Sequence, residues 1–438
     1  MMQSEHSKKE IQDTKNKLIE ARDAFEKHRQ YLAKKEKKTL ITLKTNLPGT
    51  PKNTWYSEVL LSIFHKLISE TFTIHTISKH QSFAGDSYFY TVEAAPEKAK
   101  KQCMIFEHEH HLGRFIDLDV HYRKDRYNRE DYQYPPRRCF VCDDFAHICT
   151  RDERHSKEAL RGFIENRTVE YLLEALSNNV AIALEREVYL YPKFGLVSHK
   201  DSGAHKDMNI KHFLASIHAL KPWFKTFLEV GCHLEKRKNT LRGFGIAAEK
   251  AMFEATNKIN THKGAIFIFG AFLPFFMDGI MKQKSLDEVI SSCAQFVREV
   301  TKDDFIDLEQ KTSLTAGEII YQKYGLKGIR EEVSQGFPSI MSWYNKQSYS
   351  NYQKLCAIMM RLDDTTIIKR HNLTTLKNVQ KDMSVLLKNK PFDTAMYEKL
   401  SEDYKAKGIS PGGSADIYAL VCFLDLTKHL LKNKQTID

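Results

Sequence analysis

The spacing of hydrophobic residues divides the chain into two parts. Up to about residue 156, short runs of β-branched and aromatic residues are separated by turn residues, a pattern typical of strands. These runs predict strands at 40–46, 72–77, 87–94, 103–108 and 115–122. An amphipathic helix with a wide solvated face is predicted over 8–38, and a second helix over 57–68. The first part therefore predicts an α+β domain.

Beyond that point, long segments with helical spacing dominate and strand-like alternation nearly disappears. They predict helices at 168–185, 209–220, 240–256, 286–300, 316–324, 352–362 and 416–431. The longest uncharged apolar stretch, Gly264 to Met277, is too short to span a bilayer and predicts a buried core helix, kinked or broken at Pro274. We expect a multidomain protein with an N-terminal α+β domain over 1–165 and an all-α C-terminal domain over 166–438.

Composition and charge narrow the functional classes. The 438 residues are 42% hydrophobic and 28% charged, as in an ordinary globular protein, with a formal net charge of +11. The basic excess is spread along the chain, which favours anionic small substrates or an acidic protein partner over nucleic acid. The N-terminus is polar and lacks the apolar segment of a signal peptide, and eight cysteines favour reduced thiols. These features predict a cytoplasmic protein with no membrane partner.

Paired carboxylates are the sharpest motif of the first part. In a strand over 115–120, Asp117 and Asp119 point to one face while the apolar residues between them pack behind. Such a pair can hold Mg²⁺, which prefers carboxylate and phosphate oxygens, and Arg114 could brace a phosphate beside it. The alternative is an edge strand with solvated Asp side chains. The run 107–111 (Glu-His-Glu-His-His) could add ligands or form a polar strand end.

A cluster of sulfur and imidazole groups follows. Cys139 and Cys142 have the spacing that puts two thiolates on one turn, and tetrahedral Zn²⁺ needs two further ligands. Cys149 and His155 could supply them, with His147 as a substitute. The alternative is a set of free thiols packed in a small subdomain.

In the second part, four polar residues of different chemistry precede the apolar helix. Asn260, Thr261, His262 and Lys263 are followed by Gly264, and together they offer neutral hydrogen bonds, a fixed charge and close backbone approach. This combination is typical of a phosphate or sugar site. We expect that site to be assembled from several loops, because similar polar runs occur at 193–208 and 410–416.

Those other runs each have a structural alternative. The Gly-rich loop around Lys193, with His205 and Asp207, suits a phosphorylated ligand, while Asp207-Met-Asn could simply cap the helix that starts near residue 210. Arg242 and Glu249 lie seven residues apart on one side of a helix and could form a structural ion pair or act in catalysis. The run containing Ser414 and Asp416 begins an apolar helix after two glycines.

At this point two families become recognisable. Segments 193–208, 240–270, 315–338 and 410–426 resemble the triphosphoribosyl-dephospho-CoA synthase family, which makes the prosthetic-group precursor of citrate lyase. The motifs Asn-Thr-His-Lys-Gly (260–264) and Pro-Gly-Gly-Ser-Ala-Asp (411–416) carry this resemblance. Residues 20–160 resemble the apo-citrate lyase phosphoribosyl-dephospho-CoA transferase family, through 40–52, 113–120 and 138–155. The chain is thus similar to a fusion of the two.

The resemblance implies two sequential reactions, with ATP and 3'-dephospho-CoA as substrates and Mg²⁺ as a cofactor. In the C-terminal domain, a ribose hydroxyl of dephospho-CoA displaces adenine from C1 of the ATP ribose. In the N-terminal domain, a serine of the apo acyl carrier subunit of citrate lyase attacks the α-phosphate of the product and releases pyrophosphate.

The resemblance also implies roles for individual residues. For the first reaction, we expect Asp207 or Glu249 to activate the hydroxyl, and His262 is a further catalytic candidate. Side chains expected to hold the substrates are Lys193, His205, Arg242, Asn260, Thr261, His262, Lys263, Ser414 and Asp416. For the second reaction, Asp117 and Asp119 would hold Mg²⁺, while Arg114 and Lys52 would orient phosphates.

Three motifs depart from the family pattern. Pro-Lys-Pro-Gly reads Pro-Lys-Phe-Gly at 192–195, Thr-Gly-Gly-Val-Asn reads Thr-Asn-Lys-Ile-Asn at 256–260, and Asp-Thr-Asn reads Asp-Thr-Thr at 364–366. One alternative is therefore a chain with only one active half, the synthase half being degenerate. Another, from a different class, is a zinc-containing nucleic-acid-binding protein, which rests on the basic charge and the cysteine cluster.

Overall fold

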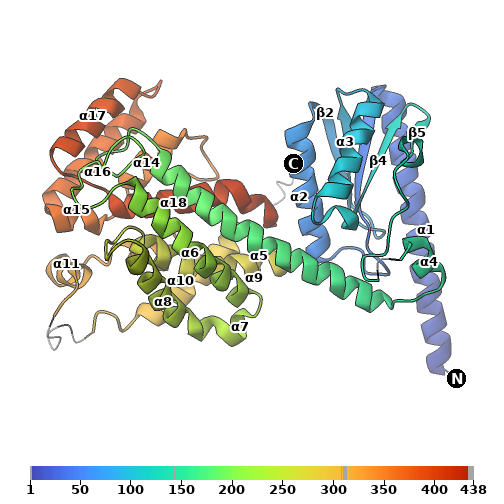
Figure 1. Cartoon of the computed structure of the whole chain (residues 1–438), viewed down its shortest axis with the longest axis horizontal. Coiled ribbons are helices and arrows are strands. Elements are labelled where there is room, and N and C mark those ends of the chain that lie inside the picture. Colours follow the sequence, from blue (N-terminus) through green and yellow to red (C-terminus); the bar gives the residue numbers. More distant parts are fainter. Residues whose placement is uncertain (1, 143, 307, 309–312, 433–438) are drawn as a thin grey trace. The chain divides into compact units, whose positions relative to one another are not determined.

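The computed structural model describes residues 2–142, 144–306, 308 and 313–432 (Figure 1). It divides into two compact units, one up to Leu172 and one from Leu173 onward. Helix α5 (Lys157–Tyr189) runs through this boundary, and the boundary expected at residue 165 lies in the same helix.

The N-terminal unit is built on one antiparallel sheet with the strand order β2-β3-β1-β4-β5. Its strands are β1 (Thr39–Thr45), β2 (Ile74–His80), β3 (Ser87–Val92), β4 (Ile116–Tyr122) and β5 (Asp125–Tyr127). Central β1 pairs with β3 on one side and β4 on the other, with Lys44 opposite Asp117 and Thr42 opposite Asp119. Four of the five expected strands are therefore confirmed, with shifted ends.

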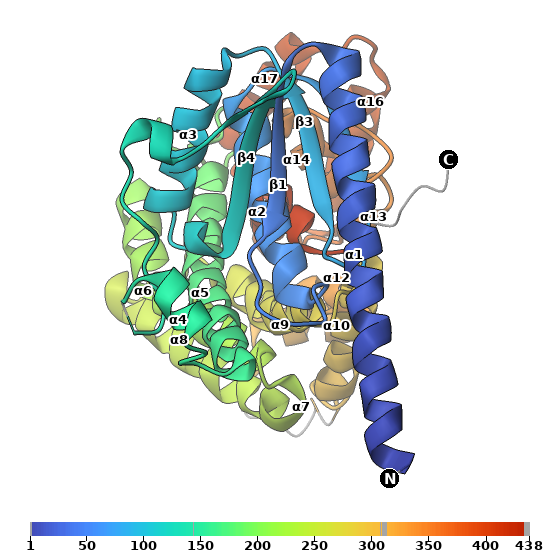
Figure 2. The same ribbon diagram turned by 90° about the vertical axis from the view of Figure 1, so that its right-hand side faces the viewer.

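Helices cover both faces of this sheet. Helices α2 (Trp55–Thr71) and α3 (Pro96–Glu109) pack on one face, where Ile41, Leu43 and Leu118 belong to the main apolar core. Helix α1 (Met2–Glu36) lies along the other face, and its Leu32 and Ala33 pack on Leu40 and Phe89 (Figure 2). The carboxylates of β4 lie on the face that α1 covers only in part. Short helix α4 (Ala146–Arg151) follows the turn that contains Cys139 and Cys142, which we call the cysteine turn.

The strand predicted at 103–108 is wrong, because these residues lie in α3. Its buried residues Ala99, Cys103 and Phe106 follow helical spacing, and Pro96 starts the helix at a position where a missing N–H costs nothing. The four apolar residues at 103–106 are compatible with either element, and the helix that begins at Pro96 continues through them.

The described part of the C-terminal unit contains helices and no strand, which agrees with the expected all-α class. After α5 they are α6 (Ile210–Gly231), α7 (Leu234–Arg237), α8 (Leu241–Ala255), α9 (Lys263–Met281), α10 (Leu286–Thr301), α11 (Ala316–Tyr324), α12 (Ile329–Ser334), α13 (Pro338–Met341), α14 (Asn351–Met359), α15 (Thr365–Arg370), α16 (Leu373–Lys388), α17 (Thr394–Ala406) and α18 (Gly412–Thr427).

Helix α9 forms the centre of this unit, packed among α6, α8, α10 and α18. By length and composition it could cross a membrane, but 78% of its apolar window is buried inside the unit. The helix continues through Pro274, so the expected break does not occur. Gly231 of α6 lies against the Pro274 carbonyl, where a Cβ would overlap it. The prediction of a buried core helix is confirmed.

A glycine at the start of the Asp117 segment gives the first testable prediction. A Cβ at Gly113 would overlap the Phe106 carbonyl oxygen and lie 2.7 Å from that of Glu107, and neither backbone atom can move away. We expect Gly113→Ala to lower the stability of the N-terminal unit by ~1–3 kcal/mol.

The matched control is Gly162→Ala on α5, where a Cβ meets nothing within 4 Å. It should raise helix stability by up to about 1 kcal/mol. Both changes are measured by urea titration of the full chain, with hydrogen exchange of peptides from β1 to β4 as the readout. Equal stability of the two variants would contradict the assigned contact.

Candidate functional site

The two carboxylates of β4 lie among cations. Asp119 accepts a hydrogen bond from Arg126 at 2.7 Å, and the Lys44 ammonium lies 3.8 Å from its other oxygen. Burial raises the pKa of Asp119, but Lys44 and Arg126 more than offset this, so its pKa lies below the usual range. Asp119 is therefore held ionised by Lys44 on β1 and Arg126 on β5.

Asp117 belongs to a chain of contacts that crosses the sheet edge. The Arg137 guanidinium lies 3.4 Å from Asp117 Oδ1 and 2.9 Å from Glu107 Oε1. Glu107 is buried, accepts the Leu118 N–H at 2.9 Å and also pairs with Arg129. A buried carboxylate on α3 thus replaces the strand partner that β4 lacks at Leu118.

Arg114 and Lys52 flank this region. Arg114 donates a hydrogen bond to the Arg138 carbonyl, beside the cysteine turn. Lys52 lies in the loop after β1 and donates to the Leu47 carbonyl, and burial followed by the charges of Arg22 and Arg161 lowers its pKa. The loop reaches the Asp117 segment through the Asn46 N–H, which donates to the Phe115 carbonyl at 2.8 Å.

The sulfur cluster expected from the sequence is assembled in the fold. One ligand atom each from Cys139, Cys142, Cys149 and His155 lies within 4.8 Å of all the others, and the sulfurs of Cys142 and Cys149 are 3.2 Å apart. His155 Nε2 is buried and makes no hydrogen bond among the described residues. Three sulfurs and one imidazole nitrogen at these distances suit a closed tetrahedral metal site.

In the C-terminal unit, Lys193 does not face solvent. Its ammonium is buried and donates to Glu187 Oε1 at 2.6 Å and to the Glu187 carbonyl at 2.8 Å. Burial lowers the pKa of Lys193, and Glu187 offsets part of that shift. The pair fixes the loop after α5, which turns at Gly195 against the Ile409 carbonyl. That contact brings the 193–208 and 410–416 segments together.

A second buried carboxylate holds two helix starts. Asp364 accepts hydrogen bonds from the Ser414 N–H at 2.8 Å, from its hydroxyl at 2.9 Å and from the Thr366 N–H at 3.0 Å. It thereby caps α15 and also accepts backbone N–H groups from the first turn of α18. The Ser414 hydroxyl is occupied by this contact.

Asp416 joins the first turn of α18 to the first turn of α9. It accepts the Ala265 N–H, and its carboxylate packs so closely on Gly264 that a Cβ there would overlap it. Burial, followed by the neighbouring carboxylates of Glu187 and Asp364, raises the pKa of Asp416 well above its usual range. The Asn-Thr-His-Lys-Gly and Pro-Gly-Gly-Ser-Ala-Asp segments therefore meet at one point.

The residues before α9 point in different directions. His262 is buried, with Nδ1 2.8 Å from Ser216 Oγ, and burial lowers its pKa to about 3. His262 Nε2 and Thr261 Oγ1 are buried without a hydrogen bond among the described residues. Asn260 is exposed and caps the Lys263 N–H at 3.2 Å.

Lys263 and Arg242 belong to different ion pairs. The Lys263 ammonium donates to Glu249 of α8, and both remain partly exposed. Arg242 lies exposed on the same helix and contacts Asp304 at 3.4 Å, which also pairs with Arg330. The structure thus brings Glu249 to Lys263, and it does not bring Arg242 to Glu249.

His205 lies between Ser410 and Arg370. Its Nε2 is 2.8 Å from Ser410 Oγ, and Arg370 reaches its Nδ1 at 3.2 Å. Burial and the Arg370 charge lower the pKa of His205. Asp207 is 69% exposed and lies 3.9 Å from His205. The cap of α6 is Asn209, not Asp207.

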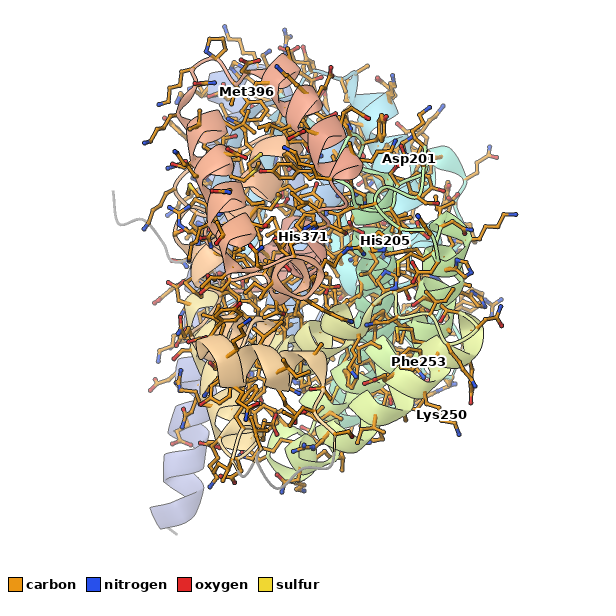
Figure 3. The ribbon with its side chains drawn as sticks, turned by 90° about the vertical axis from the view of Figure 1, so that its left-hand side faces the viewer. Asp201, His205, Lys250, Phe253, His371 and Met396 are labelled. Carbon is orange, nitrogen blue, oxygen red and sulfur yellow. The ribbon has the colours of Figure 1, made fainter. Side chains whose placement is uncertain are left out.

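An open cavity of about 550 Å³ lies on α8, beside the Lys263–Glu249 pair. It is lined by Ile246, Glu249, Lys250, Phe253, Glu254, Asn257 and Lys258. Figure 3 marks Lys250 and Phe253 on this helix. All of these residues lie on α8 or in the turn after it, so this is an open groove along one helix.

The two residues in place of the family's glycines keep a glycine-like backbone. Asn257 and Lys258 have φ of 52° and 67°, in the left-handed region that side chains disfavour. The Lys258 N–H donates to the Phe253 carbonyl at 2.7 Å and closes the turn.

Sequence reasoning missed several residues of both sites. In the C-terminal unit these are Glu187 and Ser216. In the N-terminal unit they are Lys44, Glu107 as a structural carboxylate, Arg126 and Arg137. Lys44 could have been predicted as a partner of the β4 carboxylates. The alternation along β1 places its side chain on the same sheet face as Asp117 and Asp119. No local signal identifies Glu187, which lies in the last turn of a long helix.

Comparisons with known proteins match both parts of the chain. Residues 173–435 match the family model for ATP:dephospho-CoA triphosphoribosyl transferase, and residues 13–171 match that for apo-citrate lyase phosphoribosyl-dephospho-CoA transferase. Protein CitXG of Leuconostoc mesenteroides subsp. cremoris is 30% identical over 93% of this chain and 96% of its own length. Protein CitXG of Haemophilus influenzae is 33% identical over 71% and 73%. The 2-(5''-triphosphoribosyl)-3'-dephosphocoenzyme-A synthase of Haemophilus ducreyi is 33% identical over 65% and 98%.

The left-handed turn before α9 makes a stability prediction. Lys258→Gly should stabilise the C-terminal unit by roughly 0.5–1 kcal/mol, because glycine adopts positive φ without a Cβ clash. Lys250→Gly, in the interior of exposed α8, is the control and should destabilise by about 1 kcal/mol. Hydrogen exchange of α8 and α9 peptides during urea titration measures both. Destabilisation by both variants would contradict the assigned conformation.

The buried imidazole predicts a pH dependence. With a folded pKa of about 3, His262 stays neutral while the unfolded chain takes up a proton below about pH 6.5. His262 therefore adds nothing to the free energy of unfolding above pH 6.5. As the pH falls from 6.5 to about 3, His262 lowers that free energy by about 1.4 kcal/mol per pH unit.

Buried acids with raised pKa values stabilise the folded protein as the pH falls, which opposes the effect of His262. The variant His262→Gln isolates the effect of the histidine, because these acids are the same in both chains. Urea titrations between pH 6 and 4 should show a shallower loss of stability in the variant. Identical slopes would mean that the folded protein protonates His262 readily.

Proposed function

We propose that this chain, which belongs to the ATP:dephospho-CoA triphosphoribosyl transferase family and to the apo-citrate lyase phosphoribosyl-dephospho-CoA transferase family, is a bifunctional transferase. Its C-terminal unit makes 2'-(5''-triphosphoribosyl)-3'-dephospho-CoA from ATP and 3'-dephospho-CoA and releases adenine. Its N-terminal unit transfers the phosphoribosyl-dephospho-CoA group to a serine of the apo acyl carrier subunit of citrate lyase and releases pyrophosphate. The observation that carries the proposal is the similarity to a two-part relative along nearly the whole chain.

The C-terminal chemistry needs a carboxylate near a developing cation. The attacking hydroxyl forms a C–O bond at C1 of the ATP ribose while the C–N bond to adenine breaks, and a base takes the hydroxyl proton. Glu249 and Asp207 remain our candidates for the base. Glu249 has the better setting, because it lines the cavity and pairs with Lys263, whereas Asp207 is largely exposed.

The anionic end of ATP needs cations and N–H donors. Lys263 and Arg370 supply the charge near the point where Gly264 meets Asp416, and His205 lies between Arg370 and Ser410. Asn260 and Thr261 add neutral groups beside them. The Lys193 ammonium is already paired with Glu187, and the Ser414 hydroxyl is already paired with Asp364. These two pairs therefore hold the loops that carry the substrate-binding groups. Arg242 lies apart and would act through Asp304.

The N-terminal chemistry breaks a P–O bond to pyrophosphate as the carrier serine forms a new one. Lys44 and Arg126 stand beside Asp119, so phosphate oxygens could replace this carboxylate as their ion-pair partner. Lys52 with Arg22 and Arg161, and Arg114 at the cysteine turn, extend the basic character of this end of the sheet.

Two metals fit the donors of the N-terminal unit. Asp117 and Asp119 offer hard oxygens on one sheet face, where Mg²⁺ would neutralise charge on the departing pyrophosphate. Cys139, Cys142, Cys149 and His155 offer three sulfurs and a partnerless buried imidazole to Zn²⁺. A cytoplasmic location agrees with eight cysteines that are all free thiols.

The direct test follows both products. The purified chain is incubated with ATP, Mg²⁺ and 3'-dephospho-CoA, and adenine is followed by chromatography with mass detection. The apo carrier subunit is then added, and its mass gain is measured together with pyrophosphate. Absence of adenine from a folded chain would leave only the carrier transfer, and absence of both products would sink the proposal.

Single variants should separate the two activities. Asp117→Asn is expected to lower carrier transfer on the order of a hundredfold and to leave adenine release unchanged, while Lys263→Ala lowers adenine release at least about tenfold. Asp125→Asn on β5 and Lys282→Ala at the far end of α9 are the matched controls. Carrier transfer is assayed from preformed triphosphoribosyl-dephospho-CoA. Loss of both activities in either variant would contradict the division between the units.

A further inference from the structure

The turn that carries the sulfur cluster is tied by its backbone to the preceding arginines. Arg138 and Phe145 form an isolated antiparallel bridge, the Ala146 N–H donates to the Arg137 carbonyl at 2.9 Å, and the Cys139 N–H donates to the Asp144 carbonyl. The Val141 N–H also approaches Cys139 Sγ at 3.5 Å. The conformation of Arg137 is therefore set from the side of the cluster.

Arg137 in turn joins the turn to the carboxylate face. Its guanidinium bridges the buried Glu107 on α3 and Asp117 on β4. Arg114, two residues before β4, donates to the Arg138 carbonyl. Two arginines from opposite directions thus connect the cluster to the first residues of β4.

Backbone hydrogen bonds and the packing of Phe140 on Phe115 hold this turn, and the sulfur cluster itself adds little without a metal. Three sulfurs and an imidazole packed within 4.8 Å gain little from one another, and the connecting segment is short of secondary structure apart from α4. A structural zinc ion contributes its binding energy to the local fold, and its four protein ligands leave no open position for catalysis. An ion here would act on the reaction only through the residues that its turn positions.

We propose that a zinc ion bound by Cys139, Cys142, Cys149 and His155 holds Arg137 against Asp117 and Glu107, so that metal occupancy controls the carrier-transfer step and not adenine release. This rests on the proposed function for the N-terminal unit. Arg137 is a positioning residue, because it sets the place of Asp117 and the edge of β4. The metal is structural for its turn and regulatory for the neighbouring site.

The first experiment tests the site without any activity. The full chain is expected to hold one zinc per molecule by elemental analysis. Replacement by Co²⁺ should give the visible bands of tetrahedral cobalt with the sulfur charge-transfer bands of thiolate ligands. Cys142→Ser should alter both, while Cys232→Ser, outside the cluster, should leave them unchanged. Substoichiometric zinc together with no cobalt bands would overturn the proposal.

The second experiment tests the coupling. A chelator that prefers zinc to magnesium should lower kcat for carrier transfer at least tenfold, with the KM for the carrier unchanged and adenine release altered less than twofold. Added zinc should restore the rate. Carrier transfer that survives complete zinc removal would overturn the proposal.

Variants separate the arginine from the metal. Arg137→Ala should lower carrier transfer as chelation does while keeping its zinc, and Arg137→Lys should recover part of the rate because it keeps charge without the planar fork. Arg151→Ala is the matched control, since this exposed arginine of α4 pairs only locally, with Asp152. An Arg137→Ala variant as active as the native chain would overturn the positioning role.

A third readout keeps the coupling testable if no carrier is ever modified. Hydrogen exchange of the peptide covering 116–122 should become faster on zinc removal, because Arg137 no longer secures Asp117 and Glu107 at the β4 edge. An unchanged exchange rate would overturn the coupling. A chain with zinc-dependent exchange and no carrier transfer would instead refute the proposed function and support the metal's role at β4.

Discussion

The packing of the Asp416 carboxylate on Gly264 joins the first turns of two buried helices, and the C-terminal unit is arranged around that contact. Helix α9 is the centre of the unit, and α18 packs along it. Backbone N–H groups in the first turns of both helices donate to Asp416 and Asp364, and burial raises the pKa of both acids. Burial of these acids is tolerated because backbone N–H groups are their partners.

The same logic of buried charge recurs wherever a loop must stay in place. Lys193 and Glu187 fix the loop after α5, and Glu107 with Arg129 and Arg137 fixes the open edge of β4. Removing one member of such a pair leaves an unpaired buried charge, which is far more costly than the pair is favourable. These groups therefore fix the loops and the strand edge around them.

The sequence predicted features that depend on local periodicity. Alternation along β4 gave the correct facing of Asp117 and Asp119, and the apolar run after Lys263 gave the central helix. The six-residue run at 103–108 was assigned to the wrong element, because its length does not distinguish a strand from part of a helix. Motif chemistry singled out His205 and the segment of Asp416, and the fold brings them together, with His205 Nε2 2.8 Å from Ser410 Oγ. It could not show that Lys193 is paired with Glu187, since that contact depends on how the chain folds back after α5.

Phe194 limits which pieces of this protein can be exchanged with relatives. It adopts a φ of 45°, which proline cannot reach, and its fully buried ring packs on Tyr397 and Tyr404 of α17. Gly195 beside it has no room for a side chain. A chimaera that borrows the Pro-Lys-Pro-Gly segment alone would have to reroute the loop and would leave a hole under α17. The interchangeable module is therefore the loop together with that helix.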